Sequence, residues 1–292
     1  MKRIILIIIS CFVLQFSPAQ YDGYSSNSWE NQLEIEDLFL KHIDKTSFKK
    51  HLQKLTERPH VVGSKTNEDV IRYIGEVMNK AGLDVINYPY DVYLPKHPGS
   101  SLIEIVTPSR QVLNQKEDII SDDPFTKDSL LWKGWNAFSG SGDVTAEIVY
   151  ANYGRKEDFE TLKELGVDIK GKIVIARYGG NFRGYKAKFA EANGAAGLII
   201  YTDPKDSGFT KGLVYPEGPY YNESTIQRGS LLTTDFTGDP LTPFEPALPL
   251  DGKKKIKRLD PNEAQLHTIP VTPIGYGEAE KILGQMKGVV VP

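Results

Sequence analysis

The fold of this chain is decided by two short apolar runs near its middle, residues 171–177 (GKIVIAR) and residues 196–201 (AGLIIY). Short runs rich in Ile and Val, with Gly at their edges, are typical of strands that a sheet buries on both faces. Residues 185–192 between them predict a helix, and residues 147–151 and 157–165 before them predict another strand and another helix. This β-α-β-α-β order predicts a small packed α/β unit.

Outside this unit the pattern changes. Apolar residues recur at helical spacing over residues 33–55 and again over residues 70–78. Residues 84–94 alternate as a strand would, and residues 275–286 predict a last amphipathic helix. Residues 21–32 are polar, which predicts a disordered lead-in.

Charge balance and cysteine content exclude several classes of protein. The 292 residues carry 35 Lys and Arg against 38 Asp and Glu, a net charge of −3. This balance excludes a protein held on nucleic acid or on a membrane surface by bulk charge. Cys11 is the only cysteine, so we expect no intrachain disulfide, no cysteine nucleophile and no thiolate metal site in the mature chain.

Residues 1–20 have the features of a secretory signal peptide. Lys2 and Arg3 precede an apolar run over residues 4–16, and small residues follow it. The run is shorter than the roughly 20 residues that a membrane helix needs. Cys11 lies within it, and lipid attachment at this cysteine stays open as an alternative. We expect an exported protein (periplasmic, cell-surface or secreted) of bacterial origin, because animal ectodomains more often carry disulfides.

Known catalytic patterns are missing from the sequence. None of the five histidines has a second histidine at the His-x-x-x-His spacing that is typical of a metal site. The Gly-x-Ser-x-Gly elbow and the glycine-rich nucleotide patterns are absent too. We therefore assign no catalytic residue.

One polar cluster remains, residues 178–186 (YGGNFRGYK), directly after a predicted buried strand and at the start of a predicted helix. In open α/β sheets ligands tend to bind at this end of the strands. Arg183 offers a planar guanidinium that can hold a carboxylate through two hydrogen bonds. The alternative, that Arg183 caps a loop or pairs with a surface acid, stays open. Read from its residues, the chain is an exported α/β binding module with an anion site.

Several longer motifs follow one another from about residue 45 to the end. They are residues 59–64 (PHVVGS), 149–155 (VYANYGR), 171–179 (GKIVIARYG), 182–184 (FRG), 227–229 (QRG), 238–243 (GDPLTP) and 269–276 (IPVTPIGY). In this order they resemble the glutamate carboxypeptidase and transferrin receptor family of zinc peptidases, of which prostate-specific membrane antigen is the best-known enzyme.

The resemblance implies a mixed α/β fold. In it a protease-associated (PA, or apical) domain is inserted near the start of a zinc-peptidase α/β domain. Residues 33–89 would be the incomplete N-terminal segment of the peptidase domain. Residues 90–292 would be the apical region, with its PA core at about residues 140–250.

The resemblance also implies roles for four residues. Arg183 matches the family arginine that binds the C-terminal carboxylate of the substrate. Ser230 follows Gln-Arg-Gly, where the glutamate-preferring members have asparagine, so it would donate one hydrogen bond and a strict glutamate preference is in doubt. Thr242 matches a position at a structural calcium, and Glu245 stands in place of that position's tyrosine neighbour.

The family's two zinc ions are bound by residues that follow the apical domain, as does its general-base glutamate. This sequence ends at Pro292 before any of them. We therefore expect the N-terminal fragment of an exported zinc-dependent carboxypeptidase or dipeptidase, which would bind no cofactor and be inactive alone. Its parent would act on a peptide or dipeptide with a free C-terminal carboxylate. The resemblance allows a homodimer in that full-length parent, and we expect no nucleic-acid partner and no transmembrane span.

Two other readings stay open. One is a non-catalytic secreted binding module or receptor-like homologue, in which the PA domain only recognises partners. The other is a PA domain attached to a different exported hydrolase.

Overall fold

The computed structural model describes residues 23–288 of the chain. The predicted signal peptide and Cys11 therefore lie outside the described residues. The chain divides into two compact units, one up to Glu57 and one from Arg58 onward. Within the described range, no helix is long and apolar enough to cross a membrane.

The first unit contains helices α2 (Ser26–Lys41) and α3 (Lys45–Thr56). Helix α2 begins at Ser26, not at residue 33, so most of the predicted disordered lead-in is helical. A capping box explains this difference: the Ser25 hydroxyl accepts from the Ser28 N–H at 3.3 Å, and the Ser28 hydroxyl oxygen accepts from the Ser25 N–H at 2.9 Å. These bonds satisfy N–H groups that a helix start otherwise leaves free.

The second unit begins with α4 (Lys65–Lys80), which Ser64 caps. No side chain of α4 is buried, and its apolar face leaves Ile71 47% exposed and Met78 44% exposed. Residues 84–94, which the sequence predicts as a strand, form no regular strand. Their backbone makes isolated contacts instead, such as the Asp91 N–H to the Ala247 carbonyl at 2.9 Å. Alternating side chains favour a strand only where a partner strand is available.

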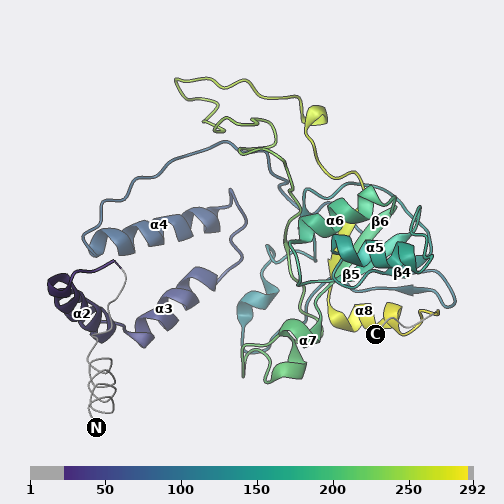
Figure 1. The fold of residues 1–292 in the computed structure, drawn as a ribbon, viewed down its shortest axis with the longest axis horizontal. Helices are drawn as coiled ribbons and strands as arrows, with labels where there is room; N and C mark the ends of the chain where they lie inside the picture. Colours follow the sequence, from purple (N-terminus) through teal and green to yellow (C-terminus); the bar gives the residue numbers. More distant parts are fainter. Residues whose placement is uncertain (1–22, 289–292) are drawn as a thin grey trace, which may run out of the picture. The chain divides into compact units, whose positions relative to one another are not determined.

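The central sheet consists of parallel strands in the order β4-β5-β6-β8 (Figure 1). Their bounds are β4 Ile148–Tyr150, β5 Ile173–Arg177, β6 Gly197–Tyr201 and β8 Val271–Ile274. The sequence predicts the first three strands but not β8, which contains Pro273. Proline lacks the N–H that a central strand needs, and β8 tolerates it because β8 is an edge strand paired with β6 alone.

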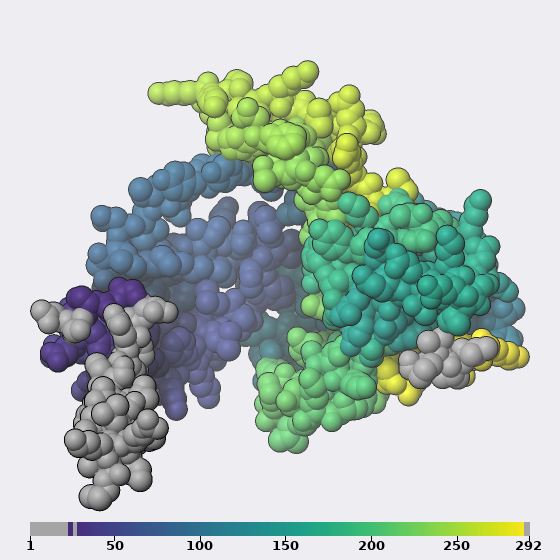
Figure 2. All heavy atoms as spheres, in the orientation of Figure 1, coloured from purple at the N-terminus to yellow at the C-terminus, as the bar shows by residue number. Residues whose placement is uncertain are grey.

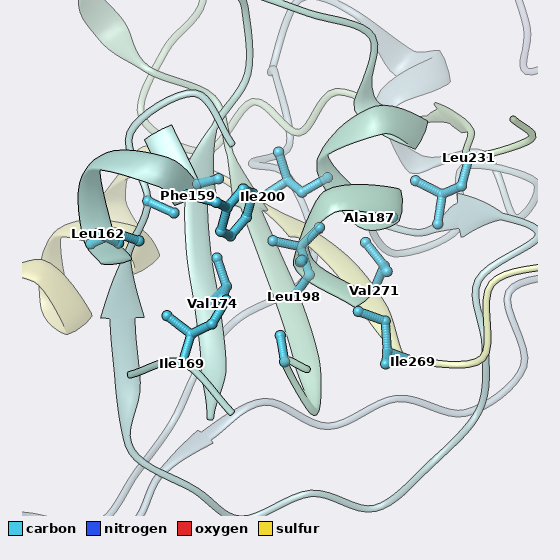
Figure 3. Close-up of a cluster of buried hydrophobic side chains, with 14 of the residues drawn as sticks. Phe159, Leu162, Ile169, Val174, Ala187, Leu198, Ile200, Leu231, Ile269 and Val271 are labelled. Atoms are coloured by element: carbon cyan, nitrogen blue, oxygen red, sulfur yellow. The ribbon is translucent and has the colours of Figure 1, made fainter. Parts of the chain in front are cut away.

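Helices cover both faces of this sheet. Helices α5 (Lys156–Glu164) and α6 (Arg183–Ala192) pack on one face, where Val174, Leu198 and Ile200 enter a common core (Figure 3). The intervening strand residues, among them Ile175 and Ile199, face α8 (Tyr276–Leu283) in a second core. The teal and green atoms of this unit form a continuous packed mass in Figure 2. Burial on both faces explains the unbroken apolar runs in the sequence, and the predicted mixed α/β fold is confirmed.

Shorter elements lie in the connections. They are β1 (Glu104–Ile105) antiparallel to β2 (Gln111–Val112), α7 (Pro204–Ser207), and the 3-10 turns η1 (Pro124–Lys127), η2 (Phe209–Lys211) and η3 (Pro261–Glu263). A parallel pair, β3 (Asn136–Ala137) with β7 (Gly229–Ser230), completes the set. This last pair fixes the position of Ser230.

Candidate carboxylate-binding site

Arg183 is the first residue of α6, and the loop of residues 178–182 connects it to the end of β5. The carboxyl edge of a parallel sheet is where such folds bind ligands. The sequence predicts this helix over residues 185–192, and in the structure it begins two residues earlier, at Arg183. Because it belongs to the helix, the guanidinium starts from a fixed backbone rather than from a mobile loop.

Lys186, one turn further along α6, ties this loop down. Its side chain is fully buried, and its ammonium donates to the Gly179 carbonyl and to the Asn181 amide oxygen, both at 2.7 Å, and also to the Tyr153 carbonyl. Burial lowers the pKa of Lys186 to about 7, although the charge of Asp158 acts in the opposite direction. Lys186 thus fixes the loop that precedes Arg183.

The Arg183 guanidinium is half-buried and lies among aromatic rings. Its Cζ is 5.5 Å from the ring centre of Phe182 and 5.7 Å from that of Tyr178. Its Nη1 makes one long contact, 3.5 Å, with the Ser230 carbonyl, and its Nε is buried without a hydrogen-bond partner. Within the part of the chain that the structure describes, Arg183 forms no ion pair. The guanidinium therefore keeps unused donors and an uncompensated charge, as an anion-binding arginine requires.

The other side of the site is the stretch of residues 226–235 that contains β7, which we call the β7 segment. Gly229 lies directly against the guanidinium, since a Cβ placed on it would be 2.2 Å from Nη1 of Arg183. A glycine is needed here for close approach. Gly184, the next residue of α6, is similar, because its Cβ would be 2.3 Å from the Leu231 carbonyl oxygen. The start of α6 and the end of β7 are thus in direct contact.

An ion pair holds the β7 segment in place from behind. Arg228 donates through Nη1 and Nη2 to the two carboxylate oxygens of Glu117 at 2.8 and 2.7 Å. Nη2 also donates to the Trp132 carbonyl at 2.6 Å, and Glu117 accepts from the Ile226 N–H at 3.1 Å. This two-point contact has the geometry that gives arginine–carboxylate pairs their directionality.

Tyr178 connects the two halves of the site. Its hydroxyl donates to the Gln227 carbonyl at 2.7 Å and lies 3.3 Å from the Asn136 side-chain amide. Burial raises the pKa of Tyr178 to about 12, although its hydrogen bond to Asn136 and the nearby Arg183 act in the opposite direction. The phenol is therefore neutral at ordinary pH and keeps the proton that it donates.

Ser230 contacts Arg183 through its backbone rather than through its hydroxyl. The Ser230 carbonyl accepts from Arg183, whereas Oγ accepts from the Leu232 N–H at 3.0 Å. Because Oγ acts as an acceptor in that bond, its own proton is available for another oxygen atom. Arg183 and Ser230 are thus brought together from distant parts of the sequence, with donors left over on both.

Thr242 and Glu245 lie in a separate loop. Their carbonyl oxygens face Gly238, at 2.6 and 3.0 Å from the position of a Cβ there. The Thr242 hydroxyl is buried and has no hydrogen-bond partner, while Glu245 is exposed. Calcium prefers oxygen ligands and takes six to eight of them. The loop offers suitable oxygens, including an unsatisfied one, but too few for a complete site.

Protein ligands for a transition metal are not gathered in the described residues. No cluster of three or more His, Cys, Asp or Glu side chains in residues 23–288 could hold a metal ion. His60 and His97 are exposed, and His267 is taken up by contacts described below.

Sequence reasoning missed several residues that shape the site. It identified Arg183 and Ser230, but it gave no role to Gly229, Tyr178 or Lys186, and it did not single out Glu117. Gly229 and Arg228 are within the Gln-Arg-Gly motif, which was a signal that the segment is constrained. Nothing local to Glu117 indicates its partner, which is 111 residues away.

Comparison with known proteins agrees with this architecture. Residues 144–234 match the PA domain family. A glutamate carboxypeptidase 2 homolog from Caenorhabditis briggsae is 34% identical over 94% of this chain and 37% of its own length. Aminopeptidase NAALADL1 from Rattus norvegicus is 31% identical over 98% of this chain and 39% of its own length. The chain thus spans well under half the length of these relatives.

Among solved structures, an aminopeptidase from Aneurinibacillus sp. strain AM-1 is 18% identical, with a TM-score of 0.36. That match covers 85% of this chain and 43% of the aminopeptidase chain.

Proposed function

Since the chain is a member of the glutamate carboxypeptidase-like family, we propose that it supplies the substrate-carboxylate site of an exported zinc-dependent carboxypeptidase or dipeptidase. In this proposal the chain is the N-terminal part of that enzyme. Arg183 binds the C-terminal carboxylate of a peptide, and Ser230 donates one further hydrogen bond to it. Export rests on residues 1–20 of the sequence.

One observation carries the proposal. Arg183 is held by its surroundings but has no carboxylate partner among the described residues, and its Nε is buried without an acceptor. Leaving a buried donor unsatisfied costs free energy, so a site of this kind gains from an incoming anion. A free C-terminus supplies a planar carboxylate that fits the guanidinium fork.

The metals of the proposal belong to the full-length protein. Two zinc ions there would supply Lewis-acid activation of water and of the scissile carbonyl, and this chain's own part is to bind and orient the substrate. Anchoring the terminal carboxylate sets the distance from the chain end to the reacting bond, which is what exopeptidase specificity requires. The Thr242 loop would add oxygen ligands to a structural calcium.

Arg183→Ala in the full-length enzyme tests the carboxylate contact. We expect kcat/KM for a dipeptide with C-terminal glutamate to fall by the equivalent of roughly 2–5 kcal/mol, because a charged hydrogen bond is lost. The matching C-terminal amide should be a poor substrate for both proteins, with little difference between them. Arg110→Ala is the matched control, since the Arg110 side chain is 80% exposed. An unchanged kcat/KM in Arg183→Ala would dismiss the proposed role.

The 292-residue chain by itself tests the assignment of the zinc chemistry. We expect it to bind no stoichiometric zinc and to release no amino acid from such dipeptides. Turnover by the purified chain would overturn the proposal that the zinc site lies elsewhere. Arg183-dependent peptide binding by a full-length protein without hydrolysis would instead indicate a receptor-like homologue.

A further inference from the structure

His267 occupies the junction between the two halves of the candidate site. Its side chain is only 8% exposed. On one side, Nδ1 lies 3.0 Å from Oε2 of Glu191, near the C-terminal end of α6. On the other side, Nε2 lies 3.1 Å from the carbonyl oxygen of Leu231, the residue after Ser230. The imidazole therefore bridges the helix that begins with Arg183 and the segment that carries Ser230.

Both ring nitrogens face acceptors. A carboxylate and a peptide carbonyl can only accept, so the two contacts are both hydrogen bonds only when both nitrogens carry a proton. The neutral ring has one N–H. If that proton is on Nδ1, the bond to Glu191 survives, and Nε2 can accept from the Thr233 hydroxyl at 3.2 Å. The carbonyl of Leu231 then loses its donor.

Leu231 has no substitute for this bond. Its side chain is fully buried and lies beside α6 near Ala187 (Figure 3). Among the described residues, no other donor meets its carbonyl oxygen, which also lies against Gly184. A buried carbonyl without a donor is costly. The peptide between Leu231 and Leu232 should therefore reorient when the ring loses its second proton.

The carboxylate of Glu191 is the acidic group in contact with the ring. Thr268 anchors Glu191 by donating its N–H to Oε1 at 2.8 Å. Burial acts to raise the pKa of Glu191, but hydrogen bonds from Thr268 and His267 outweigh it and hold that pKa below its usual value.

Other charged groups on the adjacent elements have contacts of their own. Lys188 of α6 and Asp235 of the β7 segment bind each other at 3.2 Å. On the segment of His267 itself, Glu263 accepts from the Asp260 N–H. Glu191 is therefore the charge that acts directly on the ring.

We propose that His267 is a protonation-dependent latch that positions the Ser230 segment against the Arg183 helix. The doubly protonated ring holds Glu191 and Leu231 together; when it releases one proton to solvent, the Leu231 end is freed. His267 is a positioning residue, because no contact to the Arg183 guanidinium is required of it. Imidazole side chains as a class exchange a proton between about pH 5 and 8, which is the range in which the latch is tested.

Nuclear magnetic resonance of the 292-residue chain tests the latch without any ligand. The ring ¹⁵N signals should show both His267 nitrogens protonated at the acid end of a titration. The amide signals of Leu231 and Leu232 should shift with the same midpoint as the ring. Flat amide signals through the ring titration, or a ring that stays neutral to the acid end, would overturn the latch.

Variants separate the latch from general effects of pH. His267→Gln keeps a donor and an acceptor but cannot titrate, so the shift of the Leu231 and Leu232 amides should disappear. His97→Gln removes an exposed histidine and should leave that shift intact. Persistence of the amide shift in His267→Gln would contradict the latch, even if the wild-type titration is observed.

The effect on ligand binding rests on the proposed function. In the full-length protein, the affinity for a dipeptide with C-terminal glutamate should fall several-fold as pH rises through the His267 transition, and His267→Gln should lose this dependence. If no carboxylate binds at any pH, the proposed function fails, and the latch is still decided by the amide titration.

Discussion

Gly229 and Arg183 are so close that a side chain at position 229 would displace the guanidinium: a Cβ on Gly229 would lie 2.2 Å from Nη1 and 2.5 Å from Cζ of the arginine. Real Cβ atoms do not approach other atoms so closely. The glycine of the Gln-Arg-Gly motif and the arginine of the Phe-Arg-Gly motif are far apart in the sequence, but they are in direct contact in the folded chain. The position of the guanidinium depends on the absence of a side chain.

Gly229→Ala should displace the guanidinium while leaving the sheet intact. We expect carboxylate binding by the full-length protein to fall at least about tenfold, since roughly 1.4 kcal/mol of a charged contact suffices for that factor. Gly142→Ala is the control, because its Cβ would meet its nearest neighbour at 3.5 Å, an ordinary contact. Isothermal titration with a free-carboxylate dipeptide measures the change, and equal affinities for Gly229→Ala and wild type would refute it.

The Arg228–Glu117 pair should contribute measurably to stability. Both side chains are mostly buried, 25% and 20% exposed, and removing either leaves the other charge without its partner. In a double-mutant cycle with Arg228→Met and Glu117→Gln, we expect a coupling of roughly 1.5–3 kcal/mol. The same cycle on Arg110 and Glu104, whose arginine is 80% exposed, should give a clearly smaller coupling because solvent screens the exposed charges. Similar coupling in the two pairs would contradict this expectation.

Lys186 should make stability depend on pH in the alkaline range. Its pKa is lowered by burial to about 7 in the folded chain, against 10.5 for a free lysine. Between these values the unfolded chain binds more protons, so the unfolding free energy rises with pH across this window. Urea unfolding at about pH 7.5 and 9.5 measures this slope.

Lys186→Met should lose that slope and also be less stable, since three acceptors lose their donor. Lys188→Met, on the same helix and more exposed, should retain it. A Lys186→Met slope equal to that of wild type would show that the buried ammonium does not titrate in this range.

Thr242→Val should be tolerated in the absence of calcium. The Thr242 hydroxyl is buried and unpartnered, so its removal should leave stability unchanged or raise it by about 1 kcal/mol. If the loop binds calcium in the full-length protein, Thr242→Val should reduce the rise in Tm on adding calcium. Thr202→Val removes another buried hydroxyl without a partner and should not affect that rise. An undiminished calcium response in Thr242→Val would exclude the hydroxyl as a ligand.

Local pattern identified the core of the fold correctly. The runs over residues 171–177 and 196–201 predicted β5 and β6 because burial on both faces requires unbroken apolar residues. Helices α5 and α6 followed from their spacing. Strand β8 was missed because Pro273 removes a backbone donor, and whether that matters depends on a strand being at the edge of the sheet.

The candidate site, like the fold, was predicted from the sequence only in part. Arg183 was identified from its chemistry and from its place after a buried strand. The sequence did not indicate that Glu117 pairs with Arg228 or that Glu191 and Leu231 meet at His267, because each contact joins segments more than 30 residues apart.

The sequence by itself determined the α/β unit, the arginine at the carboxyl edge of its sheet and the family of the chain, because periodicity and motifs are local properties. Only the tertiary structure decided what surrounds that arginine. Among the described residues, the fold leaves the Arg183 guanidinium without a counter-charge, places Gly229 against it and gives His267 two acceptors. These contacts arise because folding brings distant backbone and side-chain groups within hydrogen-bonding distance.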